Sequence, residues 1–343
     1  MTSDRSTPRL QDVAQRAGVS TATVSRCLNA PEKVVEKTRE KVMRAVRDLG
    51  YSPNFGARAM AAKRTFTIGA VIPTMENAIF ARGLQAFQEE LRQHGYHLLV
   101  ASSSYNTDLE QEQVHALVAR GAEGLLLIGH DRAQRTETFL RQRGLPVIVA
   151  WSYEAQSVFP SVGFDNRAAM RTIAERVLQL GHRDIGVISA PTSDNDRARA
   201  RVAGIRDALG CFGLPESSAQ VIETSYGIET GSTALRALLA ADKRLTAVIC
   251  GNDVLAAGAL RAARQLALDV PGDLSITGFD DLELASATSP ELTTMRVPHK
   301  TMGQTAARML IGMIEDASPP RSVRLEPRLM MRETLGAPRR AAP

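Results

Sequence analysis

Apolar residues recur at helical spacing in three short segments near the N-terminus. The pattern predicts helices over residues 10–17, 21–27 and 36–49. The first two are separated by Gly18, which suits the positive φ at a helix end, and by Ser20, a favourable N-cap residue. Two helices joined by such a tight turn are typical of a helix-turn-helix, whose second helix enters the DNA major groove.

The second of these helices combines an apolar stripe with a polar face. Val24 and Leu28 form the stripe. The residues that face away from it are able to contact bases or phosphates, and none is acidic: Thr21, Ala22, Ser25 and Arg26. Because two packed helices in an ordinary core give the same pattern, the motif needs support from the rest of the chain.

Positive charge is concentrated in the same part of the chain. Residues 1–64 contain 13 lysines and arginines and 6 acidic residues, a net charge of +7, whereas the remainder carries −2. This distribution is expected for a domain that neutralises DNA phosphates. The alternative is a basic face that is only solvated, and the position of the helix-turn-helix within this segment argues against it.

From residue 66 onward, short apolar segments alternate with helical ones. Strands are expected at 66–73, 97–103, 124–129 and 146–151, and then again at 183–190, 221–224, 246–253 and 274–281. The segment at 183–190 repeats the pattern of the first strand, which indicates a duplicated unit. Strands separated by helices predict two doubly wound parallel sheets, with a ligand cleft beyond the carboxyl ends of the strands.

The predicted organisation is an all-α N-terminal domain followed by an α/β core. Its parts are a disordered N-terminus (1–8), the helix-turn-helix domain (9–53), a hinge helix and linker (54–65), the core (66–336) and a tail (337–343). The first core subdomain is expected to comprise about 66–164 and 294–326, and the second about 165–293 and 327–336.

The sequence contains no motif of enzyme chemistry. Gly-x-Gly, Walker, Gly-x-Ser-x-Gly and His-Glu-x-x-His motifs are absent, so we expect no catalytic residues and no cofactor. The three widely spaced cysteines, expected to be buried or half-buried, indicate neither a disulfide framework nor a metal site. No apolar run reaches about 18 residues and no signal peptide is evident, which predicts a cytoplasmic protein without a membrane partner.

Many short motifs resemble the lactose-repressor (LacI/GalR) family of bacterial transcription regulators. In the N-terminal segment they are Asp12-Val13-Ala14, Ala17-Gly18-Val19-Ser20, Thr23-Val24-Ser25-Arg26, Leu28-Asn29, Thr38-Arg39, Gly50-Tyr51 and Pro53-Asn54. In the core they include Gly163-Phe164-Asp165-Asn166, Leu180-Gly181-His182, Asn252-Asp253 and Gly278-Phe279-Asp280-Asp281. The resemblance implies a homodimer that binds operator DNA through its N-terminal domain and a small effector in its core, which also resembles periplasmic sugar-binding proteins.

The resemblance extends to the hinge, residues 55–62, which Asn54 is able to cap. So short a helix is marginal in isolation, and in the family it orders on DNA in the minor groove. The family usually has a leucine wedge where this chain has Met60, and methionine is also a known wedge. The implied DNA contacts are Ser20, Thr21, Ala22, Thr23, Ser25, Arg26, Asn29, Asn54, Ala57 and Met60.

The implied effector site lies just beyond the predicted core strands. Its candidate residues are Phe80, Trp151, Arg201, Tyr226, Asn252 and Asp280. Arg201 and Asp280 match effector-contacting positions, although a surface salt bridge is the alternative for Arg201. Trp151 departs from the polar residue that is common in the family, and it either stacks on the effector or fills the pocket.

Two aspartates near the candidate site are expected to be structural. Asp165 is expected to cap the following helix, and Asp281 is expected to support the local structure. The effector is expected to be a sugar or, by preference, a sugar acid, because Arg201 is able to hold a carboxylate bidentately. The segment VGFDN at 162–166 is also similar to gluconate-type repressors.

The sequence therefore favours an effector-controlled transcription regulator, most simply a repressor. One alternative is a transport binding protein, which only the core supports, and another is an enzyme on a doubly wound fold, which the missing motifs oppose. Some family members form tetramers through a C-terminal heptad helix. Residues 333–343 contain no heptad, so we predict a dimer.

Overall fold

The computed structural model describes residues 7–52, 55–76, 78–242, 244–316 and 321–339. The chain forms two compact units, Met1–Phe66 and Thr67–Pro343. This division lies one residue from the boundary expected between the linker and the core. The expected disorder of residues 1–8 concerns mostly residues outside the described part of the chain.

The N-terminal unit is helical, as predicted. Its elements are α1 (Leu10–Ala17), α2 (Thr21–Asn29), a 3-10 turn (Pro31–Lys33), α3 (Glu36–Leu49) and α4 (Phe55–Ala62). The first three helices bury a small apolar core made by Val13, Ala14, Ala17, Val24, Cys27, Val42 and Ala45. Gly18 has φ of +61° and ends α1 in the left-handed conformation, so the predicted turn is confirmed. Helix α2 continues two residues beyond the predicted end at Cys27.

The first lobe of the core is built on a six-stranded parallel sheet of order β11-β5-β4-β3-β1-β2. Its strands are β1 (Thr67–Ile72), β2 (His97–Ser102), β3 (Gly124–Ile128), β4 (Val147–Ala150), β5 (Ser161–Gly163) and β11 (Val323–Arg324). Its helices are α5 (Ala78–Gln93), α6 (Thr107–Ala119), α7 (Gln134–Arg143) and α13 (His299–Glu315). Helix α13 packs on α5, so the chain returns to this lobe as expected.

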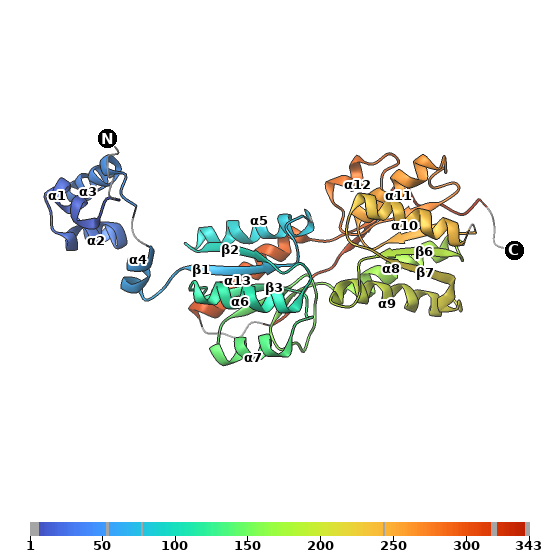
Figure 1. Ribbon diagram of the computed structural model, residues 1–343, viewed down its shortest axis with the longest axis horizontal. Coiled ribbons are helices and arrows are strands. Elements are labelled where there is room, and N and C mark those ends of the chain that lie inside the picture. Colours follow the sequence, from blue (N-terminus) through green and yellow to red (C-terminus); the bar gives the residue numbers. More distant parts are fainter. Residues whose placement is uncertain (1–6, 53–54, 77, 243, 317–320, 340–343) are drawn as a thin grey trace, which may run out of the picture. The chain divides into compact units, whose positions relative to one another are not determined.

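The second lobe repeats the arrangement around a parallel sheet of order β7-β6-β8-β9. Its strands are β6 (Ile185–Ser189), β7 (Ala219–Glu223), β8 (Ala247–Cys250) and β9 (Ser275–Thr277). Its helices are α8 (Asn166–Gln179), α9 (Asp196–Cys211), α10 (Ile228–Ala241), α11 (Asp253–Gln265) and the short α12 (Glu283–Ala287). Figure 1 shows helices on both faces of each sheet, which confirms the predicted doubly wound fold.

The connection between the lobes differs from the expected division. Strands β10 (Thr294–Arg296) and β12 (Arg328–Met330), which were expected in separate subdomains, pair with each other in an antiparallel ribbon. A bridge between Asp280 and Arg296 ties this ribbon to the end of β9. The expected tail is also partly packed, because Arg339 pairs with Asp269 on the second lobe.

Candidate functional site

Helix α2 exposes the face that was predicted to contact DNA. Ser20 caps the helix, and its Oγ accepts a hydrogen bond from the Thr23 N–H at 3.2 Å. Val24 and Cys27 are buried, while Leu28 of the predicted stripe is half-buried. The residues left exposed or half-buried on the other side are Thr21, Ala22, Ser25, Arg26 and Asn29.

The polar residues of this face differ in their freedom to reach DNA. The hydroxyls of Ser20 and Thr23 lie 2.9 Å apart, so both take part in the helix cap. The Asn29 side chain donates to Ser25 Oγ at 3.2 Å. Arg26 is exposed and has no hydrogen-bond or ion-pair partner among the described residues, which leaves its guanidinium free for a base edge.

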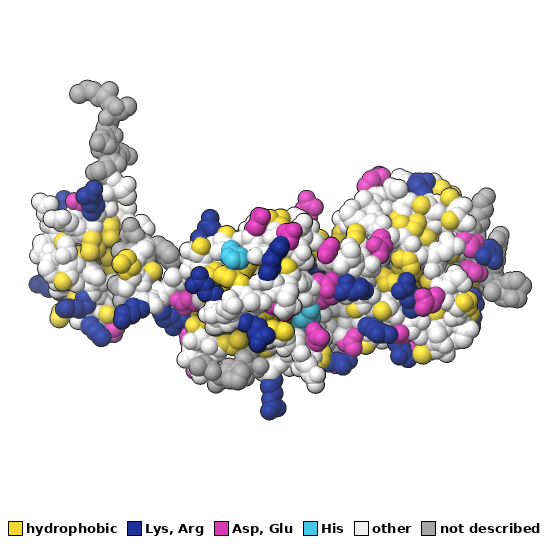
Figure 2. All heavy atoms as spheres, turned by 60° about the horizontal axis from the view of Figure 1, so that its bottom comes forward, with side chains coloured by type: hydrophobic (Ala, Val, Ile, Leu, Met, Phe, Trp, Pro, Cys, Tyr) yellow, Lys and Arg dark blue, Asp and Glu magenta, His cyan; other side chains and the backbone are white. Residues whose placement is uncertain are grey.

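Cationic side chains dominate the N-terminal unit. Figure 2 shows many more lysine and arginine side chains than acidic ones on its visible surface. Some are internally paired, such as Arg39 with Glu36 at 2.5 Å and Arg16 with Asp48 at 3.7 Å. Pairing on this scale leaves the large excess of positive charge in place, so the surface is suited to a phosphate backbone.

The hinge helix α4 carries a large apolar side chain on its surface. Met60 is 84% exposed, which packing within the unit does not explain. Ala57 lies in the same helix, and Asn54 lies outside the described residues. Met60 therefore fits the expected role of a side chain that is buried only in a complex.

Three predicted effector residues come together beyond the strand ends of the second lobe. Arg201 extends from α9, Asn252 follows β8, and Asp280 follows β9. Arg201 Nη2 lies 3.8 Å from Asp280 Oδ1, and the two side chains are 6% and 0% exposed. The alternative of a surface salt bridge is therefore wrong.

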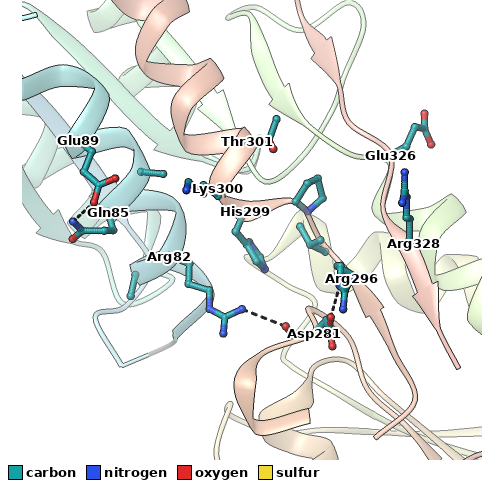
Figure 3. Close-up of a pocket in the computed structure, with 14 residues that line it drawn as sticks. Arg82, Gln85, Glu89, Asp281, Arg296, His299, Lys300, Thr301, Glu326 and Arg328 are labelled. Atoms are coloured by element: carbon teal, nitrogen blue, oxygen red, sulfur yellow. Dashed lines mark hydrogen bonds and ion pairs between the residues drawn. The ribbon is translucent and has the colours of Figure 1, made fainter. Parts of the chain in front are cut away.

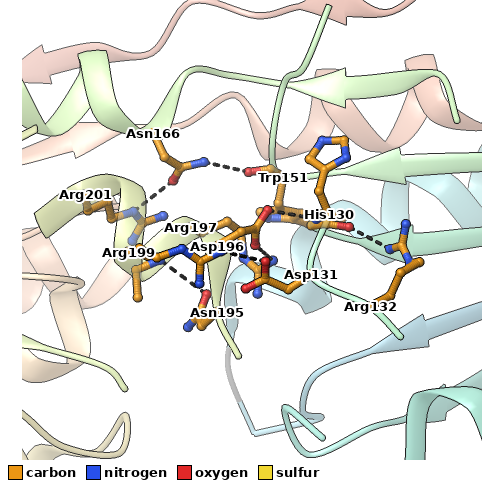
Figure 4. A network of polar contacts seen from close by, with 12 residues as sticks. His130, Asp131, Arg132, Trp151, Asn166, Asn195, Asp196, Arg197, Arg199 and Arg201 are labelled. Atoms are coloured by element: carbon orange, nitrogen blue, oxygen red, sulfur yellow. Dashed lines mark hydrogen bonds and ion pairs between the residues drawn. The ribbon is translucent and has the colours of Figure 1, made fainter. Parts of the chain in front are cut away.

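The Arg201 guanidinium is held from several sides. Its Nε donates to Asn166 Oδ1 at 2.9 Å and its Nη1 donates to the Gly251 carbonyl at 2.6 Å. The group also lies 3.8 Å from the centre of the Phe279 ring. Figure 4 shows Asn166 between Arg201 and the Trp151 carbonyl, to which Asn166 donates at 2.9 Å. The guanidinium is thus preorganised, with Nη2 directed toward Asp280.

Asp280 and Asn252 have polar atoms without hydrogen-bond partners in this buried position. Within the described part of the chain, neither carboxylate oxygen of Asp280 accepts a hydrogen bond and Asn252 Nδ2 donates none. Asn252 Oδ1 is engaged, because it caps α11 by accepting from the Leu255 N–H at 2.9 Å. Burial raises the pKa of the Asp280 carboxyl to about 7, against the opposing effect of Arg201 and Arg197.

The neighbouring aspartates serve the structure, as expected. Asp165 Oδ1 accepts from the Ala168 N–H at 2.9 Å and caps α8. Asp281 pairs with Arg296 and Arg332, both at 2.6 Å. These contacts stabilise the local structure and give both carboxylates partners within the protein, so neither carboxylate requires a ligand.

Two of the three predicted aromatic residues, Trp151 and Phe80, are buried against each other in the first lobe. Trp151 and Phe80 are each 1% exposed and pack edge to face, with ring centres 5.4 Å apart. The indole also lies against α5, since a Cβ added at Gly83 would lie 2.5 Å from its Cη2. Of the two alternatives for Trp151, its packing against Phe80 and Gly83 favours the filling role.

Tyr226 does reach the cleft, where it meets a residue that sequence reasoning missed. Its ring lies 6.0 Å from that of Tyr105, which follows β2 in the other lobe. Asn195 donates to Tyr226 Oη at 3.4 Å. Burial raises the pKa of Tyr105, so its hydroxyl stays protonated. The position of Tyr105 directly after a strand was the signal available in the sequence.

A polar network joins the lobes beside these tyrosines (Figure 4). The His130 N–H in the first lobe donates to Asp196 Oδ2 at 2.8 Å, and Arg197 Nη1 donates to Asp196 Oδ1 at 2.7 Å. Arg199 reaches across to Asp131 Oδ1 at 2.6 Å. These contacts hold the cleft closed.

The closed cleft leaves little free space. The cavity lined by Tyr105, Glu110, Asp131 and Arg197 measures about 20 Å³, far below the roughly 300 Å³ of a typical ligand pocket. A larger groove of about 1010 Å³ lies along α5 and the start of α13, and it is lined by residues that include Arg82, Asp281 and His299 (Figure 3). The larger space therefore lies outside the predicted site, and an effector enters the cleft only if the lobes separate.

The described residues were compared with two further requirements, those of a metal site and of a membrane-spanning helix. None of the groups of histidine, cysteine and acidic residues that the structure describes is arranged to hold a metal ion. Cys27 and Cys250 are buried, but Cys211 is exposed, so the expected burial was wrong for Cys211. Within the described ranges, no helix has the length and apolar character to cross a membrane.

Comparison with known proteins connects both units to one family. A family model described as "Bacterial regulatory proteins, lacI family" matches residues 9–54, and one described as "Periplasmic binding protein-like domain" matches residues 174–335. The HTH-type transcriptional repressor PurR of Escherichia fergusonii is 34% identical over 331 residues, which are 95% of this chain and 96% of PurR. The chain belongs to the LacI family of bacterial transcription regulators.

Other relatives agree with this LacI-family assignment. The HTH-type transcriptional regulator MalR of Streptomyces coelicolor is 36% identical and covers 92% of this chain and 93% of its own length. The structure of the lac repressor dimer bound to operator and the anti-inducer ONPF matches with a TM-score of 0.85 and 27% identity over 97% of this chain and 100% of that chain. These relatives are regulators, so the chain is a DNA-binding transcription regulator and not an enzyme.

Proposed function

We propose that this regulator is a repressor whose operator affinity is controlled by a small hydroxyl-rich effector, such as a sugar, bound between the core lobes. The observation that carries the proposal is the buried Asp280 carboxylate, which accepts no hydrogen bond among the described residues, together with the unpartnered amide nitrogen of Asn252. Buried polar groups are nearly always hydrogen-bonded, and leaving one unpaired costs about 1–3 kcal/mol. An effector that supplies the missing partners would recover this cost.

The contacts of Arg201 favour a neutral sugar over the sugar acid that the sequence suggested. Its Nε and Nη1 already donate to protein oxygens, and Nη2 faces Asp280. A bidentate grip on a carboxylate needs two free parallel N–H groups. An effector carboxylate would also meet the Asp280 carboxylate, whereas sugar hydroxyls are able to donate to it.

A thermal-shift screen of neutral sugars and sugar acids tests the proposal. A ligand that binds the native state raises the melting temperature by mass action. We expect stabilisation by at least one neutral sugar, and that ligand should then weaken or strengthen operator binding in a gel shift with the DNA upstream of the gene. Stabilisation by sugar acids alone would assign the acid as effector, and no response to either class would remove the proposed effector.

The proposed oligomer is a homodimer that reads a near-palindromic operator. Two recognition helices must meet half-sites about one helical turn apart, which a two-fold dimer achieves. The similar lac repressor binds its operator as a dimer, which supports the same assembly for this chain. We expect light scattering to give the mass of a dimer, and a stable tetramer would contradict the proposal.

Substitution of Arg26 should reduce operator recognition selectively. Arg26 is exposed on the recognition face, and an arginine bidentate to guanine contributes roughly 1–3 kcal/mol of discrimination. Fluorescence anisotropy should show that Arg26→Ala binds operator more weakly than the wild type, whereas its affinity for random DNA changes much less. Arg141→Ala, which removes an equal charge from exposed α7 in the core, is the matched control. An equal loss of affinity for operator and random DNA in Arg26→Ala would show that Arg26 contacts only phosphates.

Effector and operator should each change the affinity for the other by the same factor. The effector acts through its different affinities for the closed and separated lobes, and such coupling is typically about 1–3 kcal/mol. Titration of the effector with and without saturating operator measures this factor. An effector affinity that does not respond to operator would show that the cleft is not coupled to DNA binding.

A further inference from the structure

The hinge helix α4 ends on a residue that is poorly suited to its backbone conformation. Lys63 follows the last helical residue and has φ of +55°, in the left-handed region. The next N–H, that of Arg64, donates to the Ala59 carbonyl at 3.2 Å. A left-handed residue followed by this hydrogen bond is a Schellman motif, whose left-handed position is usually glycine.

The same motif ends several other helices in the described part of the chain, and there the left-handed residue is glycine. These glycines have φ between +59° and +86°, and the N–H that follows each one donates to a carbonyl five residues earlier: Gly18, Gly50, Gly95, Gly121, Gly144 and Gly213. Among the described residues, the exceptions are Lys63 and Ala267, which follows α11 with φ of +55°. Glycine is thus the ordinary choice in this chain, and α4 departs from it.

The lysine makes the folded form of α4 less favourable. In the left-handed region a Cβ crowds the following carbonyl, which lowers a folding equilibrium constant about 5- to 30-fold. The Lys63 side chain offers no compensation, because it is exposed and has no hydrogen-bond or ion-pair partner among the described residues. Unfolding of α4 releases Lys63 from this conformation, so the strain favours the unfolded helix.

A penalty of this size matters more in α4 than in α11. Helix α4 has 8 residues, a length at which an isolated helix is marginal. Among the described residues, no other helix or strand packs extensively against it. Helix α11 has 13 residues, most of them buried, so packing keeps it folded despite Ala267. The population of folded α4 therefore depends on its own end residues.

We propose that Lys63 is a positioning residue that keeps α4 only partly folded in the free protein and thereby limits operator affinity. Met60 is exposed on the same helix and is the side chain expected to enter the operator. It is correctly placed only when α4 is folded. When the binding-competent state is partly populated, the apparent affinity falls in proportion to that fraction. The inference is independent of the effector and rests on the contact between α4 and operator.

Comparison of Lys63→Gly with Lys63→Ala isolates the backbone effect. Both variants lose the lysine charge, and only glycine accepts the left-handed conformation without strain. Fluorescence anisotropy should show that Lys63→Gly binds a fragment of the DNA upstream of the gene about 5-fold more tightly than Lys63→Ala. The two variants should bind random DNA equally, because non-specific binding depends on phosphate charge.

Ala267→Gly is the matched control. It makes the same backbone change at the end of α11, in the core unit, and its side chain is also exposed. This variant should bind the upstream fragment as the wild type does. A gain in affinity as large as that of Lys63→Gly over Lys63→Ala would show a general effect of stability and would overturn the role of Lys63.

Amide hydrogen exchange tests the folding of α4 without any DNA. The α4 amides should exchange more slowly in Lys63→Gly than in Lys63→Ala, by up to about 5-fold, while the amides of α3 exchange alike in both variants. Equal exchange in α4 would contradict the effect of Lys63 on the helix. Slower exchange with equal affinity for the upstream fragment would contradict the link between helix folding and operator binding.

Discussion

Met60→Ala should lose operator affinity by about 100-fold or more while its effector affinity in the free protein stays unchanged. Met60 is 84% exposed on α4 and contributes little to the fold, so its truncation should not unfold the unit. Apolar wedges unstack a base step at a cost of a few kcal/mol, which is recovered only when the bent DNA wraps the protein. Without the wedge, that compensation is lost.

The matched control is Met75→Ala, which truncates another exposed methionine in the core unit. Anisotropy on operator and random DNA, together with a bending assay, distinguishes the two variants. Met75→Ala should behave as wild type on both DNAs. Normal operator bending by Met60→Ala would remove this side chain from the mechanism.

The helix boundaries near the N-terminus were predictable because local residues determine them. The glycines at positions 18 and 50 both adopt left-handed φ, at +61° and +62°, and Ser20 caps α2 as expected. Each signal acts within one helical turn of its element. Sequence reading is strongest where such short-range interactions decide the structure.

The location of the candidate effector residues was predictable where it depends on the ends of the parallel strands. Arg201, Asn252 and Asp280 come from separate elements, yet parallel strands bring their carboxyl ends to one edge. The orientation of Trp151 was not predictable in this way. It depends on Gly83 in α5 and on His299 in α13, which are distant in the sequence.

Long-range pairing also decided the connection between the lobes. The ribbon of β10 and β12 joins residues separated by more than thirty positions, such as Thr294 and Met330. Sequence patterns predicted a strand for neither segment and placed the two in different subdomains. The pattern of a strand contains no information about its partner when both faces are partly covered.

Asp280→Asn should separate effector recognition from operator binding. The substitution preserves shape but removes the carboxylate, and hydrogen bonds to charged groups contribute about 1.5–3 kcal/mol. We therefore expect effector affinity to fall about 10- to 100-fold. Operator affinity without effector should stay close to that of the wild type, because Asp280 lies in the core unit and not in the DNA-binding unit.

The same variant should be the more stable protein at alkaline pH. Burial raises the pKa of Asp280 to about 7, so the folded wild type holds a proton that the unfolded chain, with a pKa near 3.8, has released. The resulting stabilisation is present below pH 4 and is lost as pH rises through about 7. Asparagine remains neutral throughout, so from pH 6 to pH 8.5 the stability of Asp280→Asn should rise relative to wild type by about 1–2 kcal/mol. Burial raises the pKa of Asp253 to about 8, but this residue is present in both proteins, so its contribution to the pH dependence largely cancels in the comparison.

Urea denaturation at the two pH values measures the difference in the free energy of unfolding. A difference between the two proteins that does not change with pH would show that Asp280 is already ionised in the closed cleft.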